Sequence, residues 1–100
     1  MTAIGKLEDA QASLRLLIIL HHAECPLNQK QLFHEIQSIY KLGFYTMNTA
    51  IETCIELGLI VREIKKVGNN PMASKFHSLT PKGKKIAELV LEIDKILSHP

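Results

Sequence analysis

Basic side chains gather in one stretch of this chain, where together they could bind a polyanion. Residues 62–85 contain seven lysines and arginines against one acidic residue, whereas the first fifty residues carry no net charge and the whole chain only +2. The seven are Arg62, Lys65, Lys66, Lys75, Lys82, Lys84 and Lys85. A basic patch on a nearly neutral chain is typical of nucleic-acid binding. The alternative is a lysine-rich face that only contacts solvent.

Three of these lysines follow a sequence that predicts a change from strand to helix. Thr80 can cap the first turn of a helix, and Pro81 suits a first helical position because its missing N–H needs no partner there. Lysine in a first turn opposes the helix dipole, so helix stability alone does not favour Lys82, Lys84 and Lys85. A polyanion lying across the start of the helix would favour them.

Histidine and cysteine side chains offer a second kind of chemistry, metal binding. His21, His22, Cys25 and His34 could meet where two helices join, and their nitrogen and sulfur atoms would suit zinc. Helical spacing puts His21 and His22 on different faces, however, and the cysteine spacing matches no zinc pattern. We therefore expect no metal and no other cofactor. Cys54 falls on the inner stripe of a helix and is expected to be buried and inert.

The motifs of common enzymes are missing from the sequence. There is no glycine-rich phosphate loop, no nucleophile elbow and no pair of carboxylates on a recognisable scaffold. A core of this size is also expected to be too small to enclose a pocket of a few hundred Å³ without a second subunit. We predict that the protein is not an enzyme. A cleft between two subunits could hold a small-molecule effector, although the sequence identifies none.

Length and composition predict one domain, residues 1–100. An apolar content of 46% is enough for a small core. No run of about 18 apolar residues is present, so no membrane span is predicted. There is no secretory signal, and two cysteines are too few for a disulfide framework. A cytoplasmic location follows as the expectation.

Apolar periodicity predicts a mainly α chain with a small β-hairpin, in the order helix, helix, helix, hairpin, helix. The helices are expected at about residues 8–23, 29–40, 46–57 and 81–97, and the strands at 59–67 and 75–79. Asn28 is expected to cap the second helix, and Gly58 to end the third. Gly43, in the turn before the third helix, is free to take a positive φ.

The last helix carries an apolar stripe that is longer than one small domain needs to cover itself. Its members are Ile86, Leu89, Val90, Ile93, Ile96 and Leu97. Pairing with another copy of the chain would bury the excess, together with Leu14, Leu17 and Ile18 of the first helix. An ordinary core helix is the alternative.

Two motifs one hairpin length apart carry a family resemblance. Ile55-Glu56-Leu57-Gly58-Leu59-Ile60-Val61-Arg62 and Leu79-Thr80-Pro81-Lys82-Gly83 resemble winged helix-turn-helix transcription regulators. The closest groups are the MarR-like and PadR-like repressors and the small winged-helix regulators of archaea and their viruses. The resemblance covers about residues 14–90. It implies three helices and a two-stranded wing over residues 8–79, and a C-terminal, dimerising helix over 80–97.

The resemblance also implies which residues meet DNA. The third helix would lie in the major groove, and the wing would contact the neighbouring backbone. The implied base-contact candidates are Tyr45, Thr46, Asn48, Thr49 and Thr53. The backbone candidates are Arg62, Lys65, Lys66 and Lys75, with Lys82, Lys84 and Lys85 if the last helix begins near the duplex. The implied function is a sequence-specific regulator that binds double-stranded DNA, a homodimeric repressor that acts by occupying its operator.

The third helix departs from this pattern. It contains no arginine or lysine, although arginine to guanine is the commonest specific contact, and it carries Glu52 and Glu56. Glu52 could accept a hydrogen bond from a cytosine amino group. Alternatively, both glutamates only face solvent, and this helix does not read DNA. The second possible function is then a winged-helix module that docks a protein partner.

Overall fold

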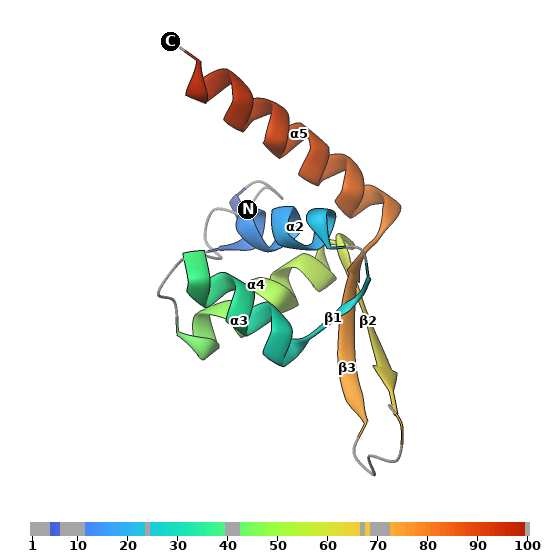
Figure 1. Cartoon of the computed structure of the whole chain (residues 1–100). Coiled ribbons are helices and arrows are strands. Elements are labelled where there is room, and N and C mark those ends of the chain that lie inside the picture. Colours follow the sequence, from blue (N-terminus) through green and yellow to red (C-terminus); the bar gives the residue numbers. More distant parts are fainter. Residues whose placement is uncertain are drawn as a thin grey trace.

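The computed structural model describes residues 5–6, 12–23, 25–39, 43–66, 68 and 73–99. The elements, in order, are α2 (Ser13–His22), β1 (Leu27–Asn28), α3 (Gln29–Ile39), α4 (Phe44–Glu56), β2 (Ile60–Lys65), β3 (Ser74–Leu79) and α5 (Pro81–Ser98). Figure 1 shows α2, α3 and α4 packed together, with the β2–β3 hairpin and α5 extending from this bundle in different directions. The predicted mainly α architecture and its order of helices and hairpin are confirmed.

The sheet has one more strand than the sequence predicts. β3 lies between β1 and β2, and both neighbours run antiparallel to it. The hairpin register runs from Ile60 opposite Leu79 to Lys65 opposite Ser74, while Leu27 lies opposite His77. The sequence predicted only a connection, and no strand, between the first two helices. That prediction is wrong because β3 leaves a second edge whose backbone groups the two residues of β1 can pair with.

The core lies where α2, α3 and α4 meet the base of the hairpin. Its fully or nearly fully buried apolar residues are Leu16, Leu17, Leu20, Leu32, Ile36, Met47, Ala50, Ile51, Cys54, Leu59, Ile60 and Ala87. Burial raises the pKa of the Cys54 thiol to about 11, against a weaker opposing interaction with Ser13. The thiol is therefore protonated at neutral pH, and the prediction that Cys54 is buried is confirmed.

The first long helix is shorter than predicted. Ala12 has a φ of 72°, in the left-handed region, and α2 begins only at Ser13. A helix continuous over residues 8–23 is therefore wrong at Ala12, because a left-handed residue interrupts the helical path. Residues 8–11 of the predicted helix lie outside the described residues. Within the described parts of the chain, no helix is long and apolar enough to cross a membrane.

Local hydrogen bonds fix the start of α3 as predicted. The Oδ1 atom of Asn28 accepts from the backbone N–H of Gln31 at 2.8 Å, and the Oε1 atom of Gln31 accepts from the N–H of Asn28 at 2.9 Å. This reciprocal pair is a capping box, which satisfies two backbone donors at the helix start. The prediction of Asn28 as the cap is confirmed.

The start of α4 differs from the prediction. The helix begins at Phe44, two residues early, and Gly43 precedes it in an extended conformation with a φ of −69°. The expected positive φ at Gly43 is therefore wrong. The Phe44 ring packs edge-on against that of Phe33 in α3, with centroids 5.2 Å apart, so a nonlocal contact favours the earlier start. Residue 40, the expected end of the second helix, and residues 41–42, which connect it to the third, lie outside the described parts.

The end of α4 forms a close junction with the start of α5. Gly58 has a φ of 77°, and hydrogen bonds run from its N–H to Ile55 O (3.0 Å) and from Leu59 N to Cys54 O (2.8 Å). These two bonds form a Schellman motif, so the prediction that Gly58 ends the helix is confirmed.

Thr80 and Gly83 hold the other side of this junction. The hydroxyl of Thr80 accepts from Gly83 N at 3.0 Å and donates to Gly58 O at 2.6 Å, which confirms Thr80 as the cap. A Cβ atom on Gly83 would lie 2.0 Å from Leu59 O, so only glycine allows this approach. The first turn of α5 is therefore packed directly against the backbone that leaves α4.

Candidate nucleic-acid interface

Helix α4 divides into an inner and an outer face. Met47, Ala50, Ile51 and Cys54 are fully buried, as predicted. The exposed residues on the outside are Tyr45, Thr49, Glu52 and Glu56, and we call them the α4 ridge. Their spacing of four, three and four residues places them along one side of the helix. Tyr45 is 84% exposed, and the other base-contact candidates, Thr46, Asn48 and Thr53, are half-buried beside the ridge.

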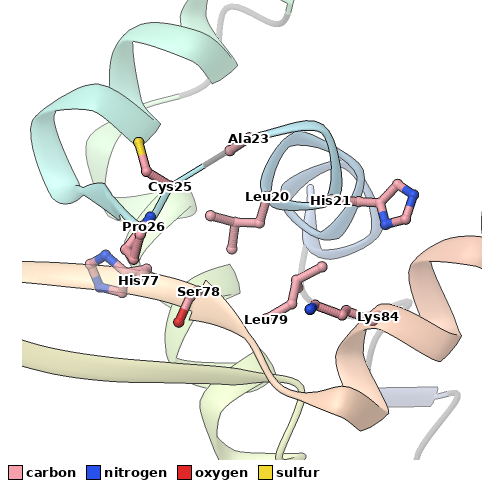
Figure 2. A pocket seen from close by; sticks show the side chains of 9 residues that line it. All are labelled: Leu20, His21, Ala23, Cys25, Pro26, His77, Ser78, Leu79 and Lys84. Atoms are coloured by element: carbon pink, nitrogen blue, oxygen red, sulfur yellow. The ribbon is translucent and has the colours of Figure 1, made fainter.

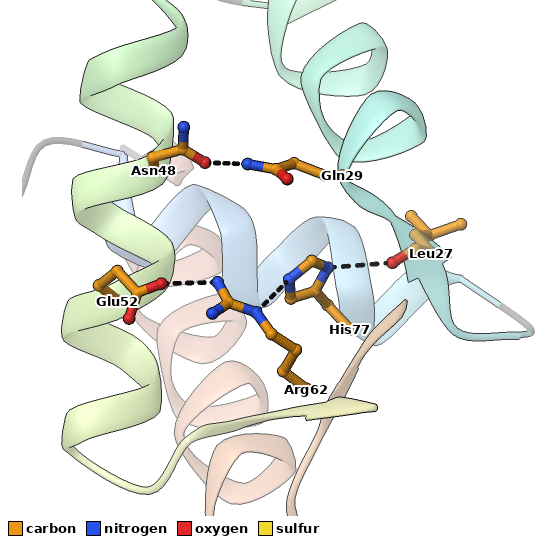
Figure 3. Close-up of polar contacts among 6 residues, drawn as sticks. All are labelled: Leu27, Gln29, Asn48, Glu52, Arg62 and His77. Carbon is orange, nitrogen blue, oxygen red and sulfur yellow. Dashed lines mark hydrogen bonds and ion pairs between the residues drawn. The ribbon is translucent and has the colours of Figure 1, made fainter. Parts of the chain in front are cut away.

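Two of the base-contact candidates already have partners within the chain. The Thr49 hydroxyl donates to the backbone oxygen of Tyr45 at 3.0 Å. The Oδ1 atom of Asn48 accepts from the Nε2 atom of Gln29 in α3 (Figure 3). The amino group of Asn48 takes no part in that bond. The bond to Gln29 therefore orients the Asn48 amide so that its amino group is directed away from Gln29 and can donate to another acceptor.

Arg62 links α4 to the sheet. Its Nη2 atom lies 2.7 Å from the Oε1 atom of Glu52, and its Nε donates to the Nε2 atom of His77 at 3.2 Å (Figure 3). The Nδ1 atom of His77 lies 3.2 Å from the carbonyl oxygen of Leu27. Because Nε2 accepts, Nδ1 carries the proton and donates to that carbonyl. We call Glu52, Arg62, His77 and the Leu27 carbonyl the Arg62 network.

The network changes the interpretation of two predicted site residues. The side chain of Arg62, a predicted phosphate contact, is 24% exposed and directed at Glu52 and His77. Glu52 is neither a free carboxylate nor one that only faces solvent, although its side chain remains 60% exposed. Sequence reasoning missed this pairing because β1, α4, β2 and β3 each contribute one member. Only the folded sheet brings them together.

The other glutamate of the ridge has a different partner. The Oε1 atom of Glu56 lies 3.2 Å from the Nζ atom of Lys6, and both side chains are well exposed. An exposed pair of this kind contributes little to stability, typically below about 1 kcal/mol. Glu56 is also the last residue of α4, so it lies beyond the turns of a reading helix that usually meet base edges.

Three of the predicted backbone-contact lysines gather on the outer part of the hairpin. Lys65, Lys66 and Lys75 are exposed, and the register puts Lys75 opposite Ile64 and next to the position opposite Lys65. Lys65 also forms an exposed ion pair of 3.2 Å with Glu63. Figure 1 shows the hairpin projecting beyond the helices, so these lysines lie on a free extension of the fold.

The lysines at the start of α5 lie elsewhere and have different surroundings. The Nζ atom of Lys82 donates to the backbone oxygen of Leu57 at 3.1 Å, at the carboxyl end of α4. A cation at that end satisfies a free carbonyl and complements the helix dipole. Our expectation that stability does not favour lysine in this turn is therefore wrong for Lys82, because the favourable contact is with another helix. Lys85 is exposed.

Lys84 lines an open pocket of about 510 Å³ between the end of α2, the segment that follows it, β3 and the first turn of α5 (Figure 2). Its lining includes the apolar side chains of Leu20, Pro26 and Leu79 and the polar ones of His21, Cys25 and Lys84. We expected a core of this size to be too small to enclose a pocket of a few hundred Å³ without a second subunit. This pocket opens at the surface, so the core does not enclose it.

The metal alternative finds no support in the described part of the chain. No three His, Cys, Asp or Glu residues there lie close enough together to hold an ion. Cys25 is exposed and lies with His21 at the pocket, and His34 does not join them there.

Burial separates the predicted dimer-contact residues into three groups. Leu17 is fully buried in the core, so its prediction as an interface residue is wrong: no surface of that side chain is left for a second copy. Ile18, Ile86 and Val90 are half-buried. The exposed members are Leu14, Leu89, Ile93, Ile96 and Leu97, with exposed fractions that rise to 78% at Leu97.

Comparisons with known proteins identify the fold through solved structures, not through sequence. The sequence matches no protein-family model and no curated protein. Among solved structures, it is similar to a possible HxlR family transcriptional factor from Thermoplasma volcanium, with a TM-score of 0.75 and 16% identity over 98% of this chain and 80% of that one. The transcriptional regulator YodB from B. subtilis, in its reduced form, is similar with a TM-score of 0.68 and 12% identity, over 92% and 82% of the two chains.

A third similar structure is Staphylococcus aureus MarR in complex with salicylate and kanamycin. It has a TM-score of 0.65 and 22% identity, over 95% of this chain and 61% of that one. These structural neighbours are winged-helix transcription regulators. The fold of this chain is therefore a winged helix-turn-helix, in which α4 occupies the position of the reading helix and the β2–β3 hairpin is the wing.

The Arg62 network predicts that stability depends on pH. Burial lowers the pKa of His77 from its ordinary value of 6.5; the bond to Leu27 opposes this, and the charge of Arg62 adds to it. Protons therefore bind more readily to the unfolded chain, so the contribution of His77 is complete above about pH 6.5 and is lost as the pH falls below that value. Urea unfolding across this range should show the free energy of unfolding decreasing towards acid.

His77→Gln is the matched variant, because glutamine can donate to Leu27 O and accept from Arg62 without titrating. Its free energy of unfolding should change less between pH 7 and pH 5 than that of the natural chain. Equal slopes in both proteins would contradict the assignment to His77.

Proposed function

We propose that this protein is a transcription regulator that binds double-stranded DNA through the α4 ridge and the wing. The supporting observation is that the Arg62 network joins these two surfaces, because Glu52 belongs to the ridge and Arg62 to the wing strand β2. In a winged helix-turn-helix, the reading helix occupies the major groove while the wing lies on the neighbouring backbone. Here the ridge offers polar and aromatic side chains, and the wing offers Lys65, Lys66 and Lys75.

The charge distribution supports a division of labour between these surfaces. Lysine contacts with phosphates provide affinity without sequence information, whereas polar side chains on the helix can read base edges. The α4 helix has 13 residues, or about 20 Å of helix, enough to lie along a stretch of major groove. Asn48 has its amide donor left over, and Tyr45 is the most exposed side chain of the ridge. By occupying an operator, such a protein would repress by excluding polymerase or a competing factor.

A salt titration tests this function directly. If three wing lysines per subunit engage phosphates in a dimer, the logarithm of affinity for random duplex should fall against the logarithm of salt with a slope of roughly −5. Lys66→Gln should weaken binding to all sequences and make the slope shallower by roughly one unit for each phosphate that is no longer neutralised. Fluorescence anisotropy at several salt concentrations measures both quantities.

Lys95→Gln is the charge-matched control, because Lys95 is exposed near the far end of α5 and away from the wing. It should leave affinity and slope unchanged. If the natural chain binds no duplex at low salt, the DNA-binding proposal fails and the protein-docking alternative takes its place.

We further propose that α5 pairs with α5 of a second copy. Its exposed apolar residues Leu89, Ile93, Ile96 and Leu97 recur at spacings of four, three and one, as on the seam of paired helices. Figure 1 shows that the second half of α5 extends past the helices of its own subunit. Nothing in the described part of the same chain covers this stripe, and a second copy would place two reading helices on one duplex.

Ile93→Glu should convert a dimer into a monomer, because it puts a charge in the middle of the stripe. Sedimentation velocity of the natural chain and the variant measures this change, and circular dichroism checks that both remain helical. Glu92→Gln, at the neighbouring exposed position, should stay dimeric. A natural chain that sediments as a monomer at tens of micromolar would overturn the pairing of α5.

The pocket beside Lys84 supports a small-molecule effector. Its volume of about 510 Å³ falls in the range of ligand sites, and its lining combines apolar side chains with polar ones, among them the ammonium group of Lys84. An apolar carboxylate would match that lining. One structural neighbour, S. aureus MarR, is described in complex with salicylate, and salicylate is therefore a reasonable probe. The pocket touches both α5 and β3, so an occupant would contact the dimerising helix and the wing together.

Salicylate at millimolar concentration should raise the thermal unfolding midpoint of the natural chain by mass action. Lys84→Gln should remove most of this shift, because it removes the cation that meets the carboxylate. Lys85→Gln, the next residue, does not line the pocket and should keep the shift. No shift in the natural chain, or the same shift in Lys84→Gln, would contradict the effector proposal.

A further inference from the structure

Glu52 occupies an unusual place for an acidic residue. It lies between Thr49 and Glu56 on the α4 ridge, in the helix that the proposed function puts into the major groove. A free carboxylate there would be repelled by the phosphates on both sides of the groove. Its presence therefore needs either a compensating charge or a specific acceptor role.

Arg62 supplies the compensating charge and fixes its direction. One oxygen of Glu52, Oε1, lies 2.7 Å from Nη2 of Arg62, and Arg62 is in turn held by His77. His77 is buried and bound to the backbone of Leu27, so the series of bonds ends on a main-chain atom. The guanidinium cannot turn away without breaking two hydrogen bonds. The carboxylate is therefore neutralised and held from one side only, and Oε2 lies outside the bond to Arg62.

The exposure of the two partners is asymmetric. The side chain of Arg62 is 24% exposed, whereas that of Glu52 is 60% exposed. Here the arginine is sheltered and the carboxylate remains on the surface. Arg62 therefore holds the carboxylate in place, and the carboxylate remains accessible to a further hydrogen-bond donor.

We propose that Glu52 is a specificity-determining residue that accepts a hydrogen bond from the N4 amino group of a cytosine in the major groove, with Arg62 as its positioning residue. This inference rests on the proposed DNA-binding function. Cytosine and adenine both present an amino group in the major groove, but adenine has the N7 acceptor beside it. A carboxylate bound to the amino group of adenine would also face the lone pair of N7 and be repelled by it, so cytosine is the better partner. A reading helix without arginine can thus still recognise a G·C pair, from its cytosine side.

Sequence selection from a random duplex library is the test, with the natural chain, Glu52→Gln and Glu92→Gln compared. The natural chain should enrich cytosine at one position of each half-site, by roughly five-fold or more over other bases, which is the lower range for one mismatched pair. In Glu52→Gln, the amide oxygen can still accept from Arg62, which leaves an N–H donor facing outward. The preference for cytosine should then disappear and move towards bases that present an acceptor in the major groove, as guanine, thymine and adenine (through N7) do.

Glu92→Gln removes the same charge at an exposed position of α5, outside the ridge and the wing, and should keep the natural preference. Arg62→Lys retains the positive charge but cannot make both bonds, so cytosine discrimination should fall several-fold while affinity for random duplex is retained. Thermal unfolding of each variant checks that the fold persists. If the natural chain selects a motif that Glu52→Gln leaves unchanged, the inference is overturned and the DNA-binding function stands. If the natural chain binds no duplex, the proposed function itself fails.

Discussion

The guanidinium group of Arg62 joins α4 to the wing. It bonds to α4 through Glu52 and to β3 through His77. Arginine suits this position because its planar fork provides several fixed donors, whereas lysine offers one compact charge. Removing the side chain would leave the buried Nε2 atom of His77 without a partner, at a cost of about 1–3 kcal/mol. The angle between ridge and wing is therefore set by a polar network as well as by the core.

The junction of α4 and α5 adds a second constraint, at the carboxyl end of α4. Gly58, Thr80 and Gly83 hold the two helix ends in backbone contact, and Lys82 bonds to the residue that follows α4. The proposed dimer helix is therefore attached to α4, the proposed reading helix, without a flexible connection. A rigid junction of this kind would let pairing of α5 determine the spacing of two reading helices.

Sequence-based prediction succeeds for interactions between residues close in the chain and fails for those between distant residues. The caps at Asn28, Gly58 and Thr80 depend on bonds to residues within five positions along the chain, and all three were predictable. The strand β1 depends on a partner 50 residues away, and no pattern in two residues indicates it. The left-handed Ala12 and the extended Gly43 were also missed, because backbone conformation there depends on packing that local sequence does not encode.

The candidate site also depends on contacts between residues that are distant in the chain. Sequence placed seven basic residues in one region, but the fold distributes them among the wing, the Arg62 network, the end of α4 and a pocket. Charge in the sequence therefore predicted a polyanionic partner. Only the fold separates exposed basic side chains from those with structural contacts.

Amide chemical shifts measured by NMR during titration with duplex DNA at low salt test the central claim most directly. The account predicts changes concentrated in residues 44–53 of α4 and in the wing residues 62–66 and 73–76, with the second half of α5 unaffected. Changes confined to α5 and the pocket, or no changes at all, would contradict the claim that this winged helix binds DNA through its ridge and wing.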